Sequence, residues 1–233
     1  MPKGNKRARS DEKKSQPYKR YKRSAKSSLK VTSLGQGFVS GMPKVRRVHQ
    51  RYAETVSVTS TAGVLGTYQF RANSPYDPNY SGAGHQPMGF DQMAALYNHY
   101  VVLKSKIRVN IVDAGSGTPL ASVWGIHLSD GTPVAYTDEN GFIEANKGPH
   151  QVRLLRSGAP GGLYKDFNAI TFFDVKQPTD NDQIGAEVST NPLELALFQI
   201  WYRTLDGSTA AAALQVTIDY WIEFREPQDL AQS

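Results

Sequence analysis

The most regular pattern in the chain lies in its last third, where apolar and polar side chains alternate through residues 195–204 and again through 212–224. Alternation with a period of two predicts strands with one buried face. A turn at 205–208, which reads Leu-Asp-Gly-Ser, joins the two strands. The residues predicted to face the core are Phe198, Ile200, Tyr202, Val216, Ile218, Tyr220 and Ile222.

Six other stretches are rich in β-branched and aromatic residues and are bounded by turn residues, so they predict further strands. They are 52–60, 67–71, 100–112, 119–129, 151–156 and 169–175. Strands do not alternate with helices, which excludes a parallel sheet of βαβ units. We predict an all-β domain, a single eight-stranded antiparallel jelly roll of two four-stranded sheets. The periodicity by itself also fits an immunoglobulin-like sandwich or a lipocalin-like barrel.

The connections between these strands are long. Residues 89–98 predict the one short helix, with an apolar stripe of Phe90, Met93, Ala94 and Tyr97. Turn residues dominate 131–149 and 176–191, which predicts two exposed loops, the first with a short hairpin. Residues 157–162, Ser-Gly-Ala-Pro-Gly-Gly, predict a glycine-rich loop. Long ordered loops usually contact something, so they are candidates for function.

Charge is distributed unevenly along the 233 residues. The chain has 27 Lys and Arg, 21 Asp and Glu, and a formal net charge of +6. Residues 1–30 contain twelve of the basic residues and only two acidic ones, Asp11 and Glu12, so this segment carries +10 and the rest of the chain −4. A basic arm on a mildly acidic domain is typical of proteins that bind a polyanion.

The arm has almost no apolar side chains, so we predict that residues 1–30 are disordered and contact nucleic acid through phosphates. The predicted contacts are Lys3, Lys6, Arg7, Arg9, Lys13, Lys14, Lys19, Arg20, Lys22, Arg23, Lys26 and Lys30. A second basic group, Lys44, Arg46 and Arg47, is predicted to add contacts. The same clusters fit a nuclear-import signal, and a merely solubilising tail is the alternative. We place a linker at 31–47, the shell domain at 48–227 and a short tail at 228–233.

Three segments follow one another closely between residues 70 and 107: FRANSPYDPN from Phe70, GHQPMGFDQ from Gly84 and LYNHYVVLKSKI from Leu96. In this order they resemble the coat proteins of circovirus-like small circular single-stranded DNA viruses. The resemblance implies a viral coat protein and single-stranded DNA as its ligand. Together with the basic arm and the β domain, it predicts a capsid protein that self-assembles into an icosahedral shell in the virion and packages that DNA. The import signal in the arm would add a nuclear import receptor as a partner and the host nucleus as a location during assembly.

In a shell, loops at the ends of the sheets are what neighbouring subunits reach. Tyr76, Tyr80, Met88 and Phe90 are therefore the predicted subunit-interface residues. The alternative is that these side chains cover the sheet of their own subunit.

Other chemistry finds little support in the sequence. Cys is absent, the five His lack the short spacings of a metal site, and no nucleophile elbow or phosphate-binding loop occurs. We therefore predict no enzyme activity, no metal, no cofactor and no membrane insertion. Two other functions remain: a nuclear nucleic-acid-binding adaptor that does not assemble, and a jelly-roll lectin. The lectin is disfavoured because Trp124, Trp201 and Trp221 all fall within predicted strands.

Overall fold

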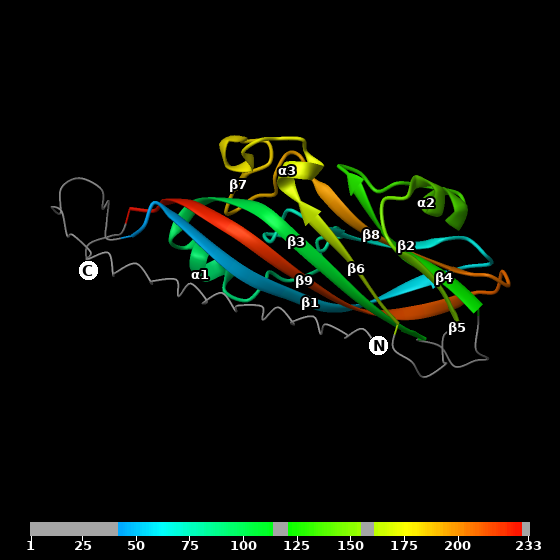
Figure 1. Cartoon of the computed structure of the whole chain (residues 1–233). Helices are drawn as coiled ribbons and strands as arrows, with labels where there is room; N and C mark the ends of the chain where they lie inside the picture. Colours follow the sequence, from blue (N-terminus) through cyan, green and yellow to red (C-terminus); the bar gives the residue numbers. More distant parts are fainter. Residues whose placement is uncertain (1–41, 114–120, 155–160, 230–233) are drawn as a thin grey trace, which may run out of the picture. The chain divides into compact units, whose positions relative to one another are not determined.

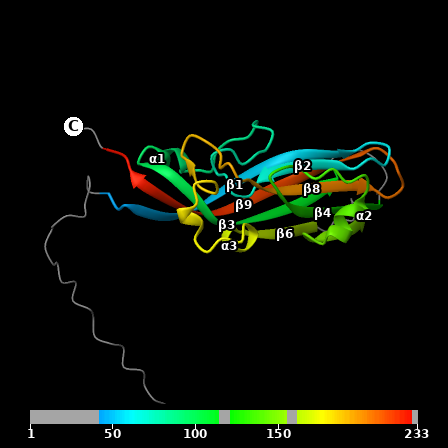
Figure 2. The same cartoon turned by 90° about the horizontal axis from the view of Figure 1, so that it is seen from above.

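The structure is a computed structural model of the chain, and it describes residues 42–113, 121–154 and 161–229. The predicted arm at 1–30 and most of the predicted linker lie outside the described residues. Two antiparallel sheets account for most of the described chain, as Figures 1 and 2 show. No helix in this part of the chain has the length and apolar character needed to cross a membrane.

The first sheet has the strand order β1-β9-β3-β6, and the second has the order β2-β8-β4-β5. The strands of the first sheet are β1 (Val45–Ser60), β9 (Ala210–Pro227), β3 (Tyr97–Asp113) and β6 (Gly161–Asn168), and the two-residue β7 (Ala186–Glu187) pairs with β3. The strands of the second sheet are β2 (Gly66–Arg71), β8 (Ala196–Thr204), β4 (Ala121–Asp130) and β5 (His150–Leu154).

This strand order confirms the predicted jelly roll. The chain crosses repeatedly between the sheets, so that strands adjacent in space are distant in sequence, as β1 and β9 are. Apart from β7, which adds a short fifth strand to the first sheet, the two four-stranded sheets connected in this way form the double Greek key of a jelly roll. An up-and-down barrel would instead pair each strand with the next one along the chain.

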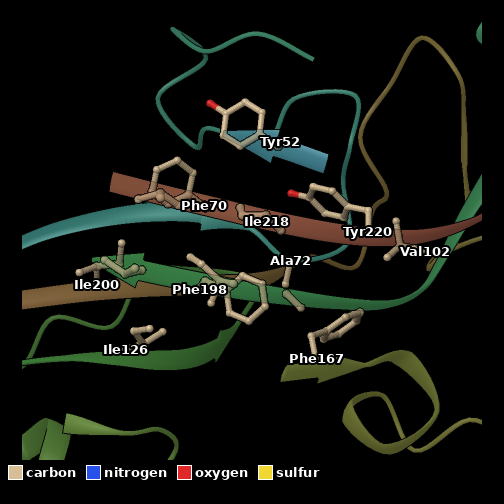
Figure 3. Close-up of a cluster of buried hydrophobic side chains, with 14 of the residues drawn as sticks. Tyr52, Phe70, Ala72, Val102, Ile126, Phe167, Phe198, Ile200, Ile218 and Tyr220 are labelled. Atoms are coloured by element: carbon tan, nitrogen blue, oxygen red, sulfur yellow. The ribbon is translucent and has the colours of Figure 1, made fainter. Parts of the chain in front are cut away.

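The core lies between the sheets and consists of the inward side chains of both (Figure 3). All seven residues predicted from the last two strands are buried there, because each strand alternates as expected. Strand β8 is buried on both faces, because α2 (Glu139–Ala145) and the loop before it, at Val134, cover the outer one. The ring of Phe142 in α2 stacks on Trp201 with ring centroids 5.3 Å apart.

Two predicted elements are wrong. The predicted strand at 169–175 is the short helix α3 (Ala169–Phe172), capped by Asn168, whose side chain accepts a hydrogen bond from the backbone N–H of Ile170. The sixth strand lies upstream, in β6, where its glycine-rich start concealed the alternation. The predicted hairpin within 131–149 is instead α2, where the Asp138 side chain caps the first turn by accepting from the Gly141 N–H.

Three other boundaries differ from the predictions. Helix α1 spans only Phe90–Ala94, because β3 already begins at Tyr97. Strand β1 begins at Val45, so Arg46 and Arg47, assigned to the linker, belong to the strand. The loop at 176–191 contains a single 3-10 turn, η1 (Pro178–Asp180), and β7.

Candidate nucleic-acid interface

The predicted basic group at the start of β1 is divided between the two faces of the first sheet. Lys44 directly precedes the strand and is exposed. Arg47 is on the outer face, which points away from the second sheet, and its side chain is 74% exposed. Arg46 is on the opposite side, where it lines a shallow pocket with Met93 and Tyr97. Only Arg47 therefore shares a face with the next basic residue of the strand, Arg51.

Strand β3 adds three more cations to that outer face. Lys104, Lys106 and Arg108 alternate with the buried residues Ser105 and Ile107. A β-bulge at residue 103 shifts the register, so that Lys104 pairs with Trp221 while the inward alternation continues. We call the resulting surface the basic face. Its residues are Arg47, His49, Arg51, Lys104, Lys106, Arg108, Tyr164 and Trp221.

Three carboxylates lie among these cations: Asp166 is exposed beside Lys106, whereas Asp219 and Glu223 are buried. Asp219 accepts hydrogen bonds from Arg51 Nε at 2.7 Å and Nη2 at 3.2 Å, and Glu223 accepts one from Arg47 Nε at 2.8 Å. Burial by itself would raise the pKa of both carboxyls, but the arginine hydrogen bonds outweigh it and lower each pKa. The carboxylates therefore stay ionised and hold the arginines, while the guanidinium groups remain exposed.

Exposed aromatic rings lie between the cations. The Trp221 side chain is the exposed member of the three tryptophans, and the ring of His49 stacks on it with centroids 4.8 Å apart. The Lys106 ammonium lies over the Tyr164 ring at 4.2 Å and also contacts Asp166 at 3.4 Å. Cations interleaved with aromatic faces are the arrangement by which proteins bind phosphates and stack unpaired bases.

Sequence reasoning missed most of this surface. His49 and Trp221 are 172 residues apart in the chain, so no local motif contains both of them. A signal did exist in β3, where Lys104, Lys106 and Arg108 fall two residues apart within a predicted strand and must share one face. All three tryptophans lie in strands as predicted, in β4, β8 and β9, but strand membership did not reveal that Trp221 is exposed.

The predicted subunit-interface residues occupy different environments. Phe90 is fully buried and contacts Tyr100 and Phe224, so this side chain covers its own sheet and cannot be an interface anchor. Tyr76 is half-buried and packs against the core, and Tyr80 lies under the Arg71 guanidinium at 5.0 Å. Met88 is 92% exposed, and its role at a subunit interface stays a prediction.

The described ranges, 42–113, 121–154 and 161–229, contain no candidate metal site. No three His, Asp or Glu side chains come together there in a way that could hold an ion. His85 hydrogen-bonds to backbone carbonyls of Ala53 and Gln86, and His99 lies 3.0 Å from Glu226.

Solved structures similar to this chain come from viruses. A chain of Desmodium yellow mottle tymovirus is 14% identical, with all of both chains covered and a TM-score of 0.43. A decameric capsid protein of BFDV is 6% identical over 78% of this chain and 99% of that one, with a TM-score of 0.46. The T=3 Penaeus vannamei nodavirus is 10% identical over 96% of this chain and 65% of that one, with a TM-score of 0.49.

Searches by sequence gave a different result. No protein-family model matches the chain, and no curated protein matches it. Because the structural matches are 14% identical or less, the fold assignment rests on the strand order itself. The circovirus-like resemblance remains a hypothesis.

Proposed function

We propose that this chain is a viral capsid protein that assembles into a closed icosahedral shell and packages single-stranded nucleic acid. The observation that carries the proposal is the basic face on the first jelly-roll sheet, in a chain whose residues 1–30 carry a further excess of +10. Arm and sheet then supply cations to the same ligand. The choice of DNA, and the relation to circovirus-like viruses, rest on the resemblance of the three segments between residues 70 and 107.

Charge explains how such a shell could form. The body of the protein beyond residue 30 carries −4 in total, so subunits approach one another without strong repulsion. Arms carrying +10 each would repel one another unless a polyanion neutralised them. Contacts to phosphates are independent of base sequence, which suits a protein that must cover a whole genome. This role involves no catalysis, cofactor or metal.

The arm has a second role in this proposal. Its basic clusters also serve as a nuclear-import signal, bound by an import receptor before assembly in the host nucleus. Once the arm is bound to nucleic acid inside a shell, the signal is no longer accessible. The virion is therefore the final location of the protein.

The test is size-exclusion chromatography with light scattering on the full chain, with and without single-stranded DNA. The matched variant replaces the twelve basic residues of 1–30 with Gln. We expect megadalton particles that contain nucleic acid from the unmodified chain, and a large loss of nucleic acid from the variant. A chain that binds DNA but stays a monomer or dimer in all conditions would instead be the non-assembling adaptor, and the proposal would be wrong.

A further inference from the structure

Trp221 differs from the other two tryptophans in its surroundings. Trp124 and Trp201 are 0% and 2% exposed, whereas Trp221 is 41% exposed on the middle of a sheet face. Its nearest neighbours across the strands are His49 and Lys104. An aromatic residue that anchors a protein–protein contact normally has apolar neighbours. Trp221 lies instead among charged and polar side chains, which favours a charged ligand with a flat ring.

The ring of His49 is held in place for stacking. Its Nε2 lies 3.2 Å from Oδ1 of Asp219, and that carboxylate is also fixed by Arg51. The imidazole lies at 30° to the indole of Trp221, with ring centroids 4.8 Å apart. One buried carboxylate thus orients both a stacking ring and a guanidinium. Because these side chains are already ordered, they lose little conformational entropy when a ligand binds.

Cations lie on both sides of this ring pair. Lys104 is exposed, and its ammonium group has no hydrogen-bond or ion-pair partner among the residues that the structure describes. On the β1 side, Arg47 engages Glu223 through Nε only, which leaves its two terminal nitrogens for a ligand. A phosphate could therefore bind on each side of a base placed at the ring pair.

We infer that Trp221 and His49 form a stacking site for an unpaired nucleobase, with Lys104, Arg47 and Arg51 binding the adjoining phosphates. The inference rests on the proposed function, because it specifies how the basic face recognises its ligand. A duplex buries the faces of its bases, so this site selects single strands. The Lys106–Tyr164 pair is a second aromatic and cationic site on the same face. Two strand spacings and a rise of four residues place Tyr164 roughly 16 Å from Trp221.

The first experiment compares binding of a short labelled oligothymidylate and of a duplex of equal length to the full chain. Trp221→Ala is expected to weaken single-strand binding about 5- to 100-fold, the usual range for one stacked base. Trp221→Phe is expected to keep most of the affinity. Because no cation is removed, the dependence of binding on salt stays the same. Thr217→Ala, on the same face of the same strand, is the matched control and should bind normally.

The second experiment uses the emission of Trp221 itself. Added oligothymidylate should quench the fluorescence of the unmodified chain, because a base stacks on the exposed indole. It should leave Trp221→Phe unquenched, since the remaining Trp124 and Trp201 are buried. Circular dichroism checks that each variant is folded.

Three results would overturn the inference: unchanged single-strand affinity in Trp221→Ala, an equal loss for duplex and single strand, or loss of assembly with binding intact, which would make Trp221 a subunit contact. Light scattering on the same samples separates this test from that of the proposed function. A chain that binds through Trp221 but never assembles refutes the shell, whereas a shell that packages DNA regardless of Trp221 refutes only the stacking site.

Discussion

The carboxylate of Asp219 on β9 accepts two hydrogen bonds from Arg51, the residue directly opposite on β1, at 2.7 and 3.2 Å. The two partners differ in exposure, since the side chain of Asp219 is 5% exposed and that of Arg51 is 58% exposed. Removing one partner therefore does not have the same effect as removing the other.

Arg51→Ala should lower the free energy of unfolding at neutral pH, because it leaves the buried carboxylate of Asp219 without its main partner. Asp219→Asn should cost less, since water can solvate the exposed guanidinium. The double variant should cost less than the sum of the two. Urea unfolding of the four proteins gives the coupling directly. Equal and additive effects would show that the pair does not act as a unit.

The same pair predicts a dependence of stability on pH. The pKa of Asp219 is lowered in the folded state, so its contribution is complete above the unfolded pKa of about 4 and is lost as pH falls through the folded value. The destabilisation caused by Arg51→Ala should therefore shrink in acid. The measurement is the difference in unfolding free energy between the unmodified chain and Arg51→Ala, at neutral pH and at about pH 3.

His127 on β4 predicts a second pH effect in a higher range. The ring is 1% exposed, neither nitrogen has a hydrogen-bond partner in the described structure, and Tyr136 and Phe142 pack against it edge-on. Burial, with smaller effects from Lys147 and Lys165, lowers the pKa to about 4. Because the unfolded chain takes up this proton near pH 6.5, stability should fall as pH drops from 6.5 towards 4.

The full effect is on the order of 3 kcal/mol for one histidine. His127→Phe should remove most of the slope of unfolding free energy in that pH window. His150→Phe, at an exposed position on the neighbouring strand, is the control and should leave the slope in place. If His127→Phe keeps the original slope, other groups cause it.

Arg71 fixes the long loop that follows β2. Its Nη1 donates to the carboxylate of Asp77 at 2.7 Å and to the carbonyls of Asp77 and Asn79 at 2.8 and 2.9 Å. Its Nη2 also donates to the carbonyl of Tyr80 at 3.4 Å, and lysine has no second nitrogen with which to reach that group. Arg71→Lys should therefore speed amide hydrogen exchange at residues 76–82 at least several-fold, with little change in the β1 and β9 amides. Uniform loss of protection would indicate global destabilisation instead.

Gly148 lies against the backbone of β4. A Cβ placed there would be 1.8 Å from the carbonyl oxygen of Ile126, and backbone cannot move aside cheaply. We expect Gly148→Ala to cost more than about 3 kcal/mol or to prevent folding. Gly162→Ala is the matched control, because its Cβ would meet only the flexible side chain of Asn110 at close range. Chemical unfolding of both variants tests the difference.

Met88 is the predicted interface residue that remains best placed for that role. Met88→Asp should weaken self-association measured by light scattering, while the unfolding free energy of the subunit changes by less than about 0.5 kcal/mol. Phe90→Ala should do the opposite, lowering subunit stability by about 3–5 kcal/mol through a core cavity. Normal assembly of Met88→Asp would remove this residue from the interface.

Much of the fold followed from the sequence because strand alternation is local. All seven residues that the pattern at 195–204 and 212–224 predicted to face the core are buried. That prediction needed no knowledge of which strands they pair with. The basic arm could also be recognised from the sequence, because its twelve Lys and Arg lie within thirty consecutive residues. Local patterns failed where capping decided the outcome, as at Asn168, whose side chain turned an apolar run into a helix.

The basic face could be recognised only in three dimensions. His49, Lys104 and Trp221 lie far apart in the chain, and antiparallel pairing of β1, β9 and β3 with a bulge in β3 places them in one row. Burial was also a tertiary outcome, because Phe90 and Met88 are two residues apart yet one is 0% and the other 92% exposed. Sequence determined which residues form strands and where charge collects, whereas long-range pairing decided which side chains meet and which reach the surface.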